Sequence, residues 1–296
     1  MSVLVLGSGV MGKGIAKSFI QGGITCSILS RNPSTVQPPV GVTVVSELPA
    51  LRPDLIIESV PEDAVLKQDW YSRIEAAYPE GVPLASNTST LDLQTLSESL
   101  KQPGWFLGVH YFMPADVTPI VEVASVSSTY PKVLQMVLDK LKAAGKKPIV
   151  LRKAIMGLLI NRLQHAILHE AYQMIDQGIV SVEDIDLIAR EMLGPRMCIT
   201  GLIEQKDLSG LDVHALAQRS LVPKLGLSRE PARCLQDLFD AGHLGVKTGK
   251  GFYDWSVRDG HARRTEGARK LSHLLAYLQE NAPHPELSVS RTMRQG

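Results

Sequence analysis

The stretch VLVLGSGVMGKGIA, residues 3–16, decides the fold of this chain. A short apolar run ends in Gly7, Gly9 and Gly12, and the next residues have a helical pattern without proline. In such a strand–turn–helix unit, Gly7 permits the turn, Gly9 lets the backbone approach a pyrophosphate, and Gly12 lets the helix pack closely on the strand. The N-terminal end of the helix, at Val10 and Met11, offers free N–H groups and a positive dipole. The stretch therefore predicts a site for a dinucleotide cofactor.

Composition and charge exclude several classes of partner. The 296 residues are enough for one large or two ordinary domains, and the net charge of +1 gives no general attraction to nucleic acid or to a membrane surface. No apolar run reaches membrane-spanning length, and the first residues enter a strand directly, so we expect a cytoplasmic protein without a signal peptide. The three cysteines are scattered and lack CxxC spacing, and we expect them to be reduced thiols.

The first half of the chain alternates between strand and helix signals. Short apolar runs span residues 3–6, 26–29, 42–45, 55–58, 84–87 and 107–111, with helical patterns at 65–77 and 91–100. Two further strands are expected at 121–124 and 148–151, on either side of a helix over about 131–144. This rhythm predicts a Rossmann-type, doubly wound, mostly parallel sheet with helices on both faces, over residues 1–151.

Strand signals largely stop after about Arg152, and residues 152–257 are expected to form an all-helical domain. Between 161 and 177 apolar residues recur at helical spacing, and Gly178 provides a C-terminal stop. Ser181 begins a capping box that is expected to open a helix through Met192. Residues 258–296 form a polar tail, with a helical patch around 270–278 and a disordered end.

Two side chains could perform acid–base chemistry beside the cofactor. His110 ends a predicted strand, which is where open α/β sheets place their ligands, and Glu122 lies on the next strand. A carboxylate beside an imidazole fixes the tautomer of the ring and raises its basicity, which suits a general base. A single histidine is, however, more often structural than catalytic, so the pair alone does not decide the function.

Four strings outside the glycine turn, and their order along the chain, resemble the L-3-hydroxyacyl-CoA dehydrogenase family. They are IIESVPED at 56–63, ASNTSTL at 85–91, GVHYFMPADVTPIVEV at 108–123 and GLLINRL at 157–163. The string GKGFYDW at 249–255 is also similar to this family, so the resemblance covers about residues 1–256. It implies an NAD(P)-dependent enzyme that interconverts an L-3-hydroxyacyl-CoA and its 3-oxo form in fatty acid metabolism.

The resemblance also implies roles for individual residues. His110 corresponds to the catalytic base and Glu122 to its partner carboxylate, while Ser89 and Asn161 correspond to the groups that hydrogen-bond the substrate oxygen. The positions at which the family contacts its cofactor are occupied by Glu62, Lys67 and Asn87.

The sequence departs from the family at the end of the second strand. NAD-dependent Rossmann enzymes place an acidic residue there, which bonds the ribose 2′-hydroxyl and repels a 2′-phosphate. This chain has Ser30, Arg31 and Asn32 instead. An arginine and a hydroxyl can hold a 2′-phosphate through charge-assisted hydrogen bonds. We therefore expect NADP(H) to be the preferred cofactor, with NAD as the second choice.

Two further departures concern the substrate. Family members that act on acyl-CoA carry a long charged helical hairpin between the second strand and the IIES strand, and the 22 residues from Asn32 to Pro53 leave no room for one. Met113 replaces the asparagine of the family's usual HFFNP string. A free small 3-hydroxy acid is therefore the alternative substrate to an acyl-CoA, and a non-catalytic dinucleotide-binding protein is the alternative from another class.

The long apolar helix over 161–177 and the resemblance together predict a homodimer. His165 and His169 have a spacing that can hold zinc, but no third ligand is evident, so no metal site is expected. Apart from a second copy of the chain and the cofactor, the expected partner is a small-molecule substrate.

Overall fold

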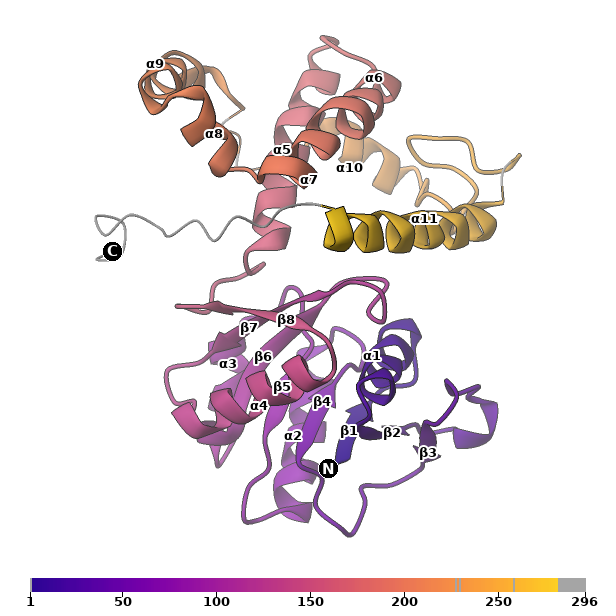
Figure 1. Ribbon diagram of the computed structural model, residues 1–296. Coiled ribbons are helices and arrows are strands. Elements are labelled where there is room, and N and C mark those ends of the chain that lie inside the picture. The colour runs from indigo at the N-terminus through magenta and orange to yellow at the C-terminus, as the bar shows by residue number, and fades with distance from the viewer. Residues whose placement is uncertain (1, 227, 229, 258, 282–296) are drawn as a thin grey trace. The chain divides into compact units, whose positions relative to one another are not determined.

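A computed structural model describes residues 2–226, 228, 230–257 and 259–281, with only the backbone of His261. The chain divides into two compact units, residues 1–165 and residues 166–296 (Figure 1). Within the described residues, no helix is long and apolar enough to cross a membrane.

The first unit is built on one eight-stranded sheet with the strand order β3-β2-β1-β4-β5-β6-β7-β8. The strands are β1 (Ser2–Leu6), β2 (Thr25–Leu29), β3 (Thr43–Val45), β4 (Leu55–Glu58), β5 (Leu84–Ser86), β6 (Phe106–Tyr111), β7 (Ile120–Ser125) and β8 (Lys147–Leu151). All neighbouring strands are parallel except β6 and β7. Because β1 to β6 are parallel, their carboxyl ends meet at one edge of the sheet.

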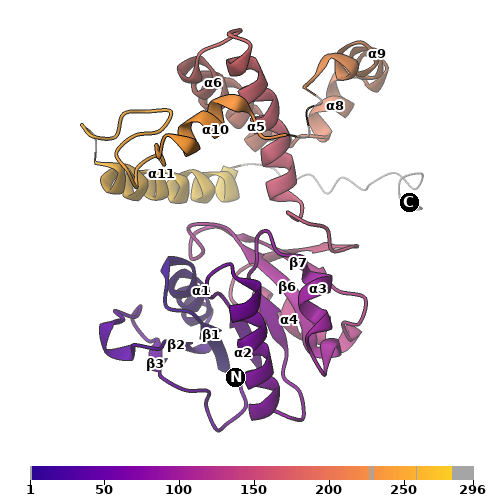
Figure 2. The same ribbon diagram turned by 180° about the vertical axis from the view of Figure 1, so that it is seen from behind.

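Four helices cover the two faces of this sheet (Figures 1 and 2). They are α1 (Val10–Gln21), α2 (Ala64–Ala77), α3 (Leu93–Glu98) and α4 (Pro131–Ala143). The alternation of the strands sorts their side chains into two apolar clusters: Val3 and Val5 face α1 and α4, whereas Leu4 and Leu6 face α2 and α3. Burial on both faces explains why the strands are almost continuously apolar.

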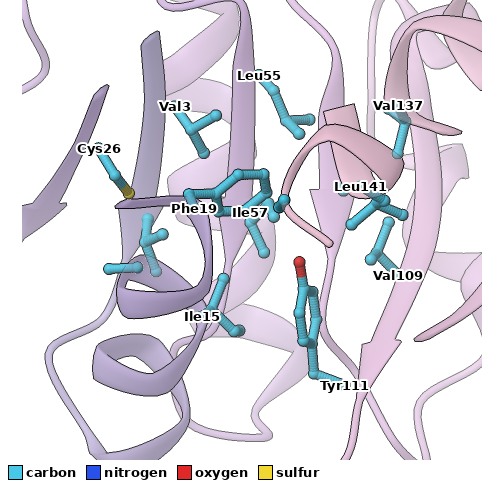
Figure 3. Packing of buried hydrophobic residues seen from close by; sticks show 14 of the residues in the cluster. Val3, Ile15, Phe19, Cys26, Leu55, Ile57, Val109, Tyr111, Val137 and Leu141 are labelled. Carbon is cyan, nitrogen blue, oxygen red and sulfur yellow. The ribbon is translucent and has the colours of Figure 1, made fainter. Parts of the chain in front are cut away.

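Figure 3 shows the cluster on the α1 and α4 face. Phe19 of α1 lies beside Ile57, and Val137 and Leu141 of α4 lie near Val109. All five side chains are fully buried. Full burial of an apolar side chain of this size stabilises the fold by about 1.5–3 kcal/mol, so this cluster fixes α1 against the strand ends that carry the site.

The second unit is helical and is organised around the C-terminal part of α5 (Ile160–Asp176). Its other elements are α6 (Val182–Ile188), a π-helix η3 (Ala189–Leu193), α7 (Gly194–Thr200), α8 (Glu204–Ser209), α9 (Leu211–Leu221), η4 (Val222–Lys224), α10 (Arg233–Asp240) and α11 (Gly260–Asn281). The Asp176 carboxylate accepts hydrogen bonds from the backbone N–H groups of Arg233 and Cys234, both at 2.8 Å, and so caps α10. Tyr172 stacks on Phe252 with ring centroids 5.6 Å apart.

The predicted fold class is confirmed: a doubly wound, mostly parallel sheet is followed by helices. All eight expected strands form, and none of their ends is shifted by more than one residue. Ser181 caps α6 by accepting a hydrogen bond from the N–H of Asp184, as the capping box predicts. The helix expected to run through Met192 differs, because it passes into the π-helix η3 at Ala189. The expected boundary at residue 151 stays a prediction, and the disordered end expected after the tail helix lies outside the described residues.

Candidate functional site

The glycine turn has the geometry that a pyrophosphate requires. Gly7 has φ +111°, and a Cβ there would collide with the carbonyl of Ser59. A Cβ on Gly12 would collide with the carbonyl of Gly7, so the helix can approach the turn only without a side chain. At Gly9, the N-cap of α1, a Cβ would have no neighbour within 4 Å. The turn is therefore closed on the side of the sheet and open where the N-terminal end of α1 can meet phosphate.

A cavity of about 840 Å³ lies along the carboxyl ends of the parallel strands. Its lining includes Gly7, Gly9, Val10, Met11 and Gly12 from the turn, Ser30, Arg31, Asn32 and Thr35 after β2, Glu62, Leu66 and Trp70 around the start of α2, and Asn87, Ser89, His110 and Met113 from the later strands. The residues present thus fit a dinucleotide, with the glycine turn in the middle and His110 towards one end. Ligands of open α/β sheets bind at this edge.

The end of β2 presents hydroxyl and guanidinium groups to the cavity. The Ser30 Oγ lies 3.1 Å from the Ser8 Oγ and accepts a hydrogen bond from the N–H of Asn32 at 3.3 Å. Arg31 is exposed, and no hydrogen bond or ion pair of its side chain is found within the described residues. Among the described lining residues the one acidic side chain is Glu62, which comes from a different strand end.

Ser89, His110 and Glu122 form a hydrogen-bonded row. The Ser89 Oγ lies 3.1 Å from the Nε2 of His110, and the Nδ1 of His110 lies 2.8 Å from the Oε2 of Glu122. The antiparallel register of β6 and β7 places His110 directly opposite Glu122, and both side chains are buried. The strand pairing thus sets the imidazole–carboxylate contact.

The hydrogen bonds of Glu122 assign the tautomer of His110. An ionised carboxylate only accepts hydrogen bonds, so the Nδ1 of His110 carries the proton and its Nε2 is the acceptor in the neutral ring. Ser89 then donates to that Nε2, which lies on the side of the cavity. An unprotonated imidazole nitrogen backed by a carboxylate can accept a proton from a hydroxyl group.

Glu122 also holds the start of α5. Its Oε1 accepts hydrogen bonds from the backbone N–H groups of Leu159 and Ile160, both at 2.8 Å. These two N–H groups would otherwise lack a partner at the helix N-terminus, where a negative charge is also favourable. Asn161 follows on the first turn of α5 but is not among the lining residues of the cavity. The structure therefore brings Ser89, His110 and Glu122 together and leaves Asn161 beside them without a direct contact to that row among the described bonds.

A second buried carboxylate, Glu58, ends β4. Its Oε1 accepts hydrogen bonds from the Nζ of Lys67 at 2.6 Å and from the N–H of Val60 at 2.9 Å. Its Oε2 accepts from the hydroxyls of Tyr71 at 2.9 Å and Ser86 at 2.7 Å. Four donors therefore satisfy a charge that is completely removed from solvent.

Glu62 holds the loop that carries Ser89. Its Oε1 accepts hydrogen bonds from the hydroxyl of Thr88 at 2.6 Å and from the N–H groups of Ser89 and Thr90 at 2.8 and 2.9 Å. Burial raises the pKa of this carboxyl, but the hydrogen bonds from Thr88, Thr90 and Ser89 and the charge of Lys67 outweigh it and lower the pKa to about 2. Glu62 is therefore ionised throughout the neutral and mildly acidic range.

The three residues expected to contact the cofactor have different surroundings. Glu62 and Asn87 line the cavity. Asn87 is fixed by a hydrogen bond from the N–H of Tyr111 to its Oδ1 at 2.9 Å and by a bond from its Nδ2 to the Ser59 Oγ at 3.2 Å. Lys67, in contrast, is fully buried, its ammonium is paired with Glu58, and it is not among the lining residues.

Lys146 forms hydrogen bonds with the backbone of the loop between β6 and β7. This buried lysine donates to the carbonyls of Ala115 at 2.6 Å and Thr118 at 2.9 Å, and burial lowers its pKa. Met113 lies at the start of this loop, lines the cavity and exposes 63% of its surface. An exposed apolar side chain at the mouth of the cavity offers contact without a hydrogen bond.

Sequence reasoning missed Glu58, Thr35 and Trp70. Glu58 carried a usable signal, because a carboxylate at the end of an otherwise apolar strand must find partners once it is buried. Thr35 and Trp70 carried none, since their place in the lining depends on how the segments after β2 and β4 return to the sheet. No group of three or more His, Cys, Asp or Glu side chains suited to a metal ion is found in the described part of the chain.

Two family models match the chain in succession. The model described as 3-hydroxyacyl-CoA dehydrogenase, NAD binding domain, matches residues 40–155. The model described as 3-hydroxyacyl-CoA dehydrogenase, C-terminal domain, matches residues 157–255. Together they cover most of the chain and include all five of the strings, from IIESVPED at 56–63 to GKGFYDW at 249–255, on which the resemblance rests.

Individual relatives agree with these models. The 5-formyl-3-hydroxy-2-methylpyridine 4-carboxylate 5-dehydrogenase of Mesorhizobium japonicum is 25% identical over 295 residues, which cover 91% of this chain and 96% of the relative. A solved structure of a dehydrogenase of that description, called an NAD⁺-dependent dismutase, has a TM-score of 0.88 at 24% identity, covers 95% of this chain and 99% of its own, and shows likeness of fold.

A solved structure of the 3-hydroxyacyl-CoA dehydrogenase of Archaeoglobus fulgidus is 30% identical, has a TM-score of 0.67, and covers 93% of this chain and 99% of its own. Its match, the two family models and the nucleotide-binding sheet lead to one assignment, which confirms the resemblance of the sequence motifs. The chain belongs to the 3-hydroxyacyl-CoA dehydrogenase family of oxidoreductases and carries that family's NAD-binding domain.

Proposed function

We propose that the protein is an NADP(H)-preferring dehydrogenase that interconverts a hydroxyl-bearing carbon and its oxo form, with His110 as the base. The observation that carries this proposal is the row Ser89–His110–Glu122 beside a dinucleotide-sized cavity. Cofactor binding alone needs neither an imidazole with an unprotonated Nε2 nor a carboxylate hydrogen-bonded to its Nδ1. The row therefore argues against a non-catalytic dinucleotide-binding protein.

In the oxidative direction, the Nε2 of His110 accepts the proton of the substrate hydroxyl. Glu122 stabilises the imidazolium through its bond to Nδ1. A nicotinamide cofactor bound in the cavity would supply the acceptor for the hydride of the carbon that carries the hydroxyl, and the hydride donor for the reverse reaction. The substrate hydroxyl replaces Ser89 as the donor to Nε2, so the one hydroxyl proton of Ser89 becomes available for a hydrogen bond to the substrate oxygen. Asn161, on the first turn of α5 and outside the cavity lining, would supply a second donor as the resemblance to the family implies. In the reductive direction, His110 returns the proton.

Replacement of His110 tests the proposed base. We expect His110→Ala to lower kcat by about 10²–10⁴-fold, because general acid–base catalysis contributes on that order. NADPH binding, measured by fluorescence titration, should stay within about threefold of the wild type, because cofactor contacts are retained. His273→Ala, on the exposed surface of α11, is the control and should leave both values unchanged. Near-normal turnover of the His110 variant would refute the assignment.

The preference for NADP(H) rests on the end of β2. Arg31 is exposed at the cavity and has no partner of its own within the described residues, while the Ser30 hydroxyl beside it offers a further donor. No acidic side chain at this strand end lines the cavity to repel a 2′-phosphate. A guanidinium that is free to form a charge-assisted hydrogen bond favours the phosphorylated ribose.

Exchange of Arg31 tests this preference. A hydrogen bond to a charged group is worth about 1.5–3 kcal/mol, so Arg31→Asp should lower the ratio of kcat/KM for NADPH to that for NADH by at least about tenfold. Lys142→Asp, exposed on α4 away from the cavity, makes the same charge change and should leave the ratio unaltered. A wild-type enzyme that binds NADH more tightly than NADPH would contradict the proposal.

The segment between β2 and β4 favours a substrate without CoA. It contains only the 3₁₀ helix η1 (Pro33–Thr35) and the three-residue strand β3, with no α-helix over residues 32–53. The family's charged hairpin, which helps to hold the CoA nucleotide, has no counterpart there. The name of the Mesorhizobium japonicum relative also describes a pyridine carboxylate and not a thioester. We therefore propose a small hydroxy carboxylic acid as the substrate, and an L-3-hydroxyacyl-CoA, which family membership favours, as the second candidate.

A comparison of initial rates separates the two substrate classes. With NADPH, free acetoacetate and other small oxo or formyl carboxylic acids should be reduced, and acetoacetyl-CoA should react at least about tenfold more slowly in kcat/KM. The loss of reduced-nicotinamide absorbance measures both. Brisk reduction of acetoacetyl-CoA, with no turnover of the free acids, would assign the thioester instead.

We also propose that the protein is a homodimer through its helical unit. Ile167 on α5, Leu208 on α8 and Leu216 on α9 each expose more than half of their surface. Large apolar side chains gathered in one unit of a protein mark an interaction surface. Sedimentation equilibrium should give twice the chain mass, and Ile167→Glu should shift it towards the monomer. A monomeric wild type at micromolar concentration would overturn this proposal.

A further inference from the structure

The loop that carries Ser89 is connected to a fully buried ion pair beneath the cavity. Glu58 lies at the end of β4, Lys67 lies one turn into α2, and Glu62 lies in the segment between them. The Nζ of Lys67 is 2.6 Å from the Oε1 of Glu58 and 3.4 Å from the Oε2 of Glu62. Lys67 therefore bridges two carboxylates of very different exposure, since the Glu58 side chain is 0% exposed and that of Glu62 is 35% exposed.

The two oxygens of Glu62 have separate partners. Oε2 faces the ammonium of Lys67, whereas Oε1 receives hydrogen bonds from two hydroxyls and two backbone N–H groups of Thr88, Ser89 and Thr90. The N–H of Ser89 is one of these donors, and its hydroxyl lies 3.1 Å from His110. The orientation of the Glu62 carboxylate thus determines where the Ser89 backbone lies.

The burial of Lys67 distinguishes a direct contact with the cofactor from support of the Glu62 carboxylate. Its side chain is 0% exposed and the residue is not part of the cavity lining, so its ammonium cannot reach a cofactor in this arrangement. A lysine is retained in such a place only when carboxylates neutralise it, and here Glu58 does so with three further donors keeping its own position fixed. The buried pair therefore fixes the ammonium of Lys67, and that ammonium contacts the Glu62 carboxylate.

We propose that Glu58, Lys67 and Glu62 act as a positioning relay that holds Ser89 against His110. Glu58 fixes Lys67, Lys67 fixes the rotamer of Glu62, and Glu62 fixes the backbone of the loop at 88–90. The proposal rests on the proposed function in assigning Ser89 to the substrate oxygen. It differs from the family-based expectation, in which Lys67 contacts the cofactor directly.

The double variant Glu58→Gln/Lys67→Met tests the relay without leaving a single buried charge. It removes both charges together, whereas Lys67→Met alone would strand the Glu58 carboxylate in the interior. Glutamine keeps a carbonyl that can accept from Tyr71 or Ser86. The matched control is Asp54→Asn/Lys140→Met, which removes another lysine–carboxylate pair, at 3.3 Å, with neither residue in the cavity lining.

The relay predicts a split between turnover and cofactor affinity. In Glu58→Gln/Lys67→Met we expect kcat to fall by about 10–100-fold, since misplacement of a reacting group by about 1 Å costs on that order. The Kd of NADPH should stay within about threefold. The control double variant should keep both values. A weakened NADPH Kd of tenfold or more, with kcat preserved at saturation, would show a direct cofactor contact and overturn the relay.

Amide hydrogen exchange tests the relay without any turnover. The N–H groups of Ser89 and Thr90 donate to Glu62, so their exchange should be at least about tenfold faster in Glu58→Gln/Lys67→Met and unchanged in the control. If the double variant does not fold, amide exchange alone is measured in Glu62→Gln, which replaces the carboxylate that faces Lys67 by an amide, because Glu62 itself lines the cavity. Unchanged exchange would refute the relay even if the enzyme is active. If exchange is faster in the double variant and the wild type turns over no hydroxy or oxo substrate of either class, the relay is upheld and the proposed function is refuted.

Discussion

The site depends on one buried carboxylate, Glu122, whose two oxygens serve two different elements. Oε2 fixes the ring of His110, and Oε1 caps the first turn of α5. Three donors make the burial of this charge tolerable, and loss of any one would leave part of it unsatisfied. Because one rigid group makes all three bonds, the orientation of the imidazole and the start of the helix that carries Asn161 are fixed together. Within the first unit, the ring of His110 and the first turn of α5 thus share a common constraint.

Much of the fold could be predicted from the sequence, because its information is local. The eight strands follow from short apolar runs, and the glycine turn follows from conformations that only glycine can adopt without a clash, as Gly7 and Gly12 illustrate. The capping of α6 by Ser181 is also a local signal. The π-helix at Ala189 was not predicted, although Gly194 and Pro195 directly after it mark the place, since Pro195 has no N–H to donate to the preceding turn.

The motifs predicted which residues form the candidate site but not the contacts between them. Resemblance suggested Ser89, His110 and Glu122, and the antiparallel register supplies the geometry that joins the last two. The placement of Lys67 could not be foreseen, since its partner Glu58 is nine residues earlier and the two meet only because α2 folds back over the end of β4. Lysine side chains are rarely fully buried, so nothing in the sequence indicated that Lys67 would lie in the interior and outside the cavity.

The two buried carboxylates of the sheet, Glu58 and Glu122, differ in the side chain with which each is paired. Glu58 is paired with the Nζ of Lys67, and neither residue is among the lining residues of the cavity, so this pair is not placed to exchange a proton with a substrate. Glu122 is paired with an imidazole, the one side chain whose ordinary pKa lies near neutrality, and the Nε2 of that ring contacts Ser89, which lines the cavity. Both carboxylates meet the same physical requirement, which is to neutralise a charge inside the protein. The identity of the paired group therefore agrees with the two proposals, a supporting role for Glu58 at the end of β4 and a catalytic role for His110 near the end of β6.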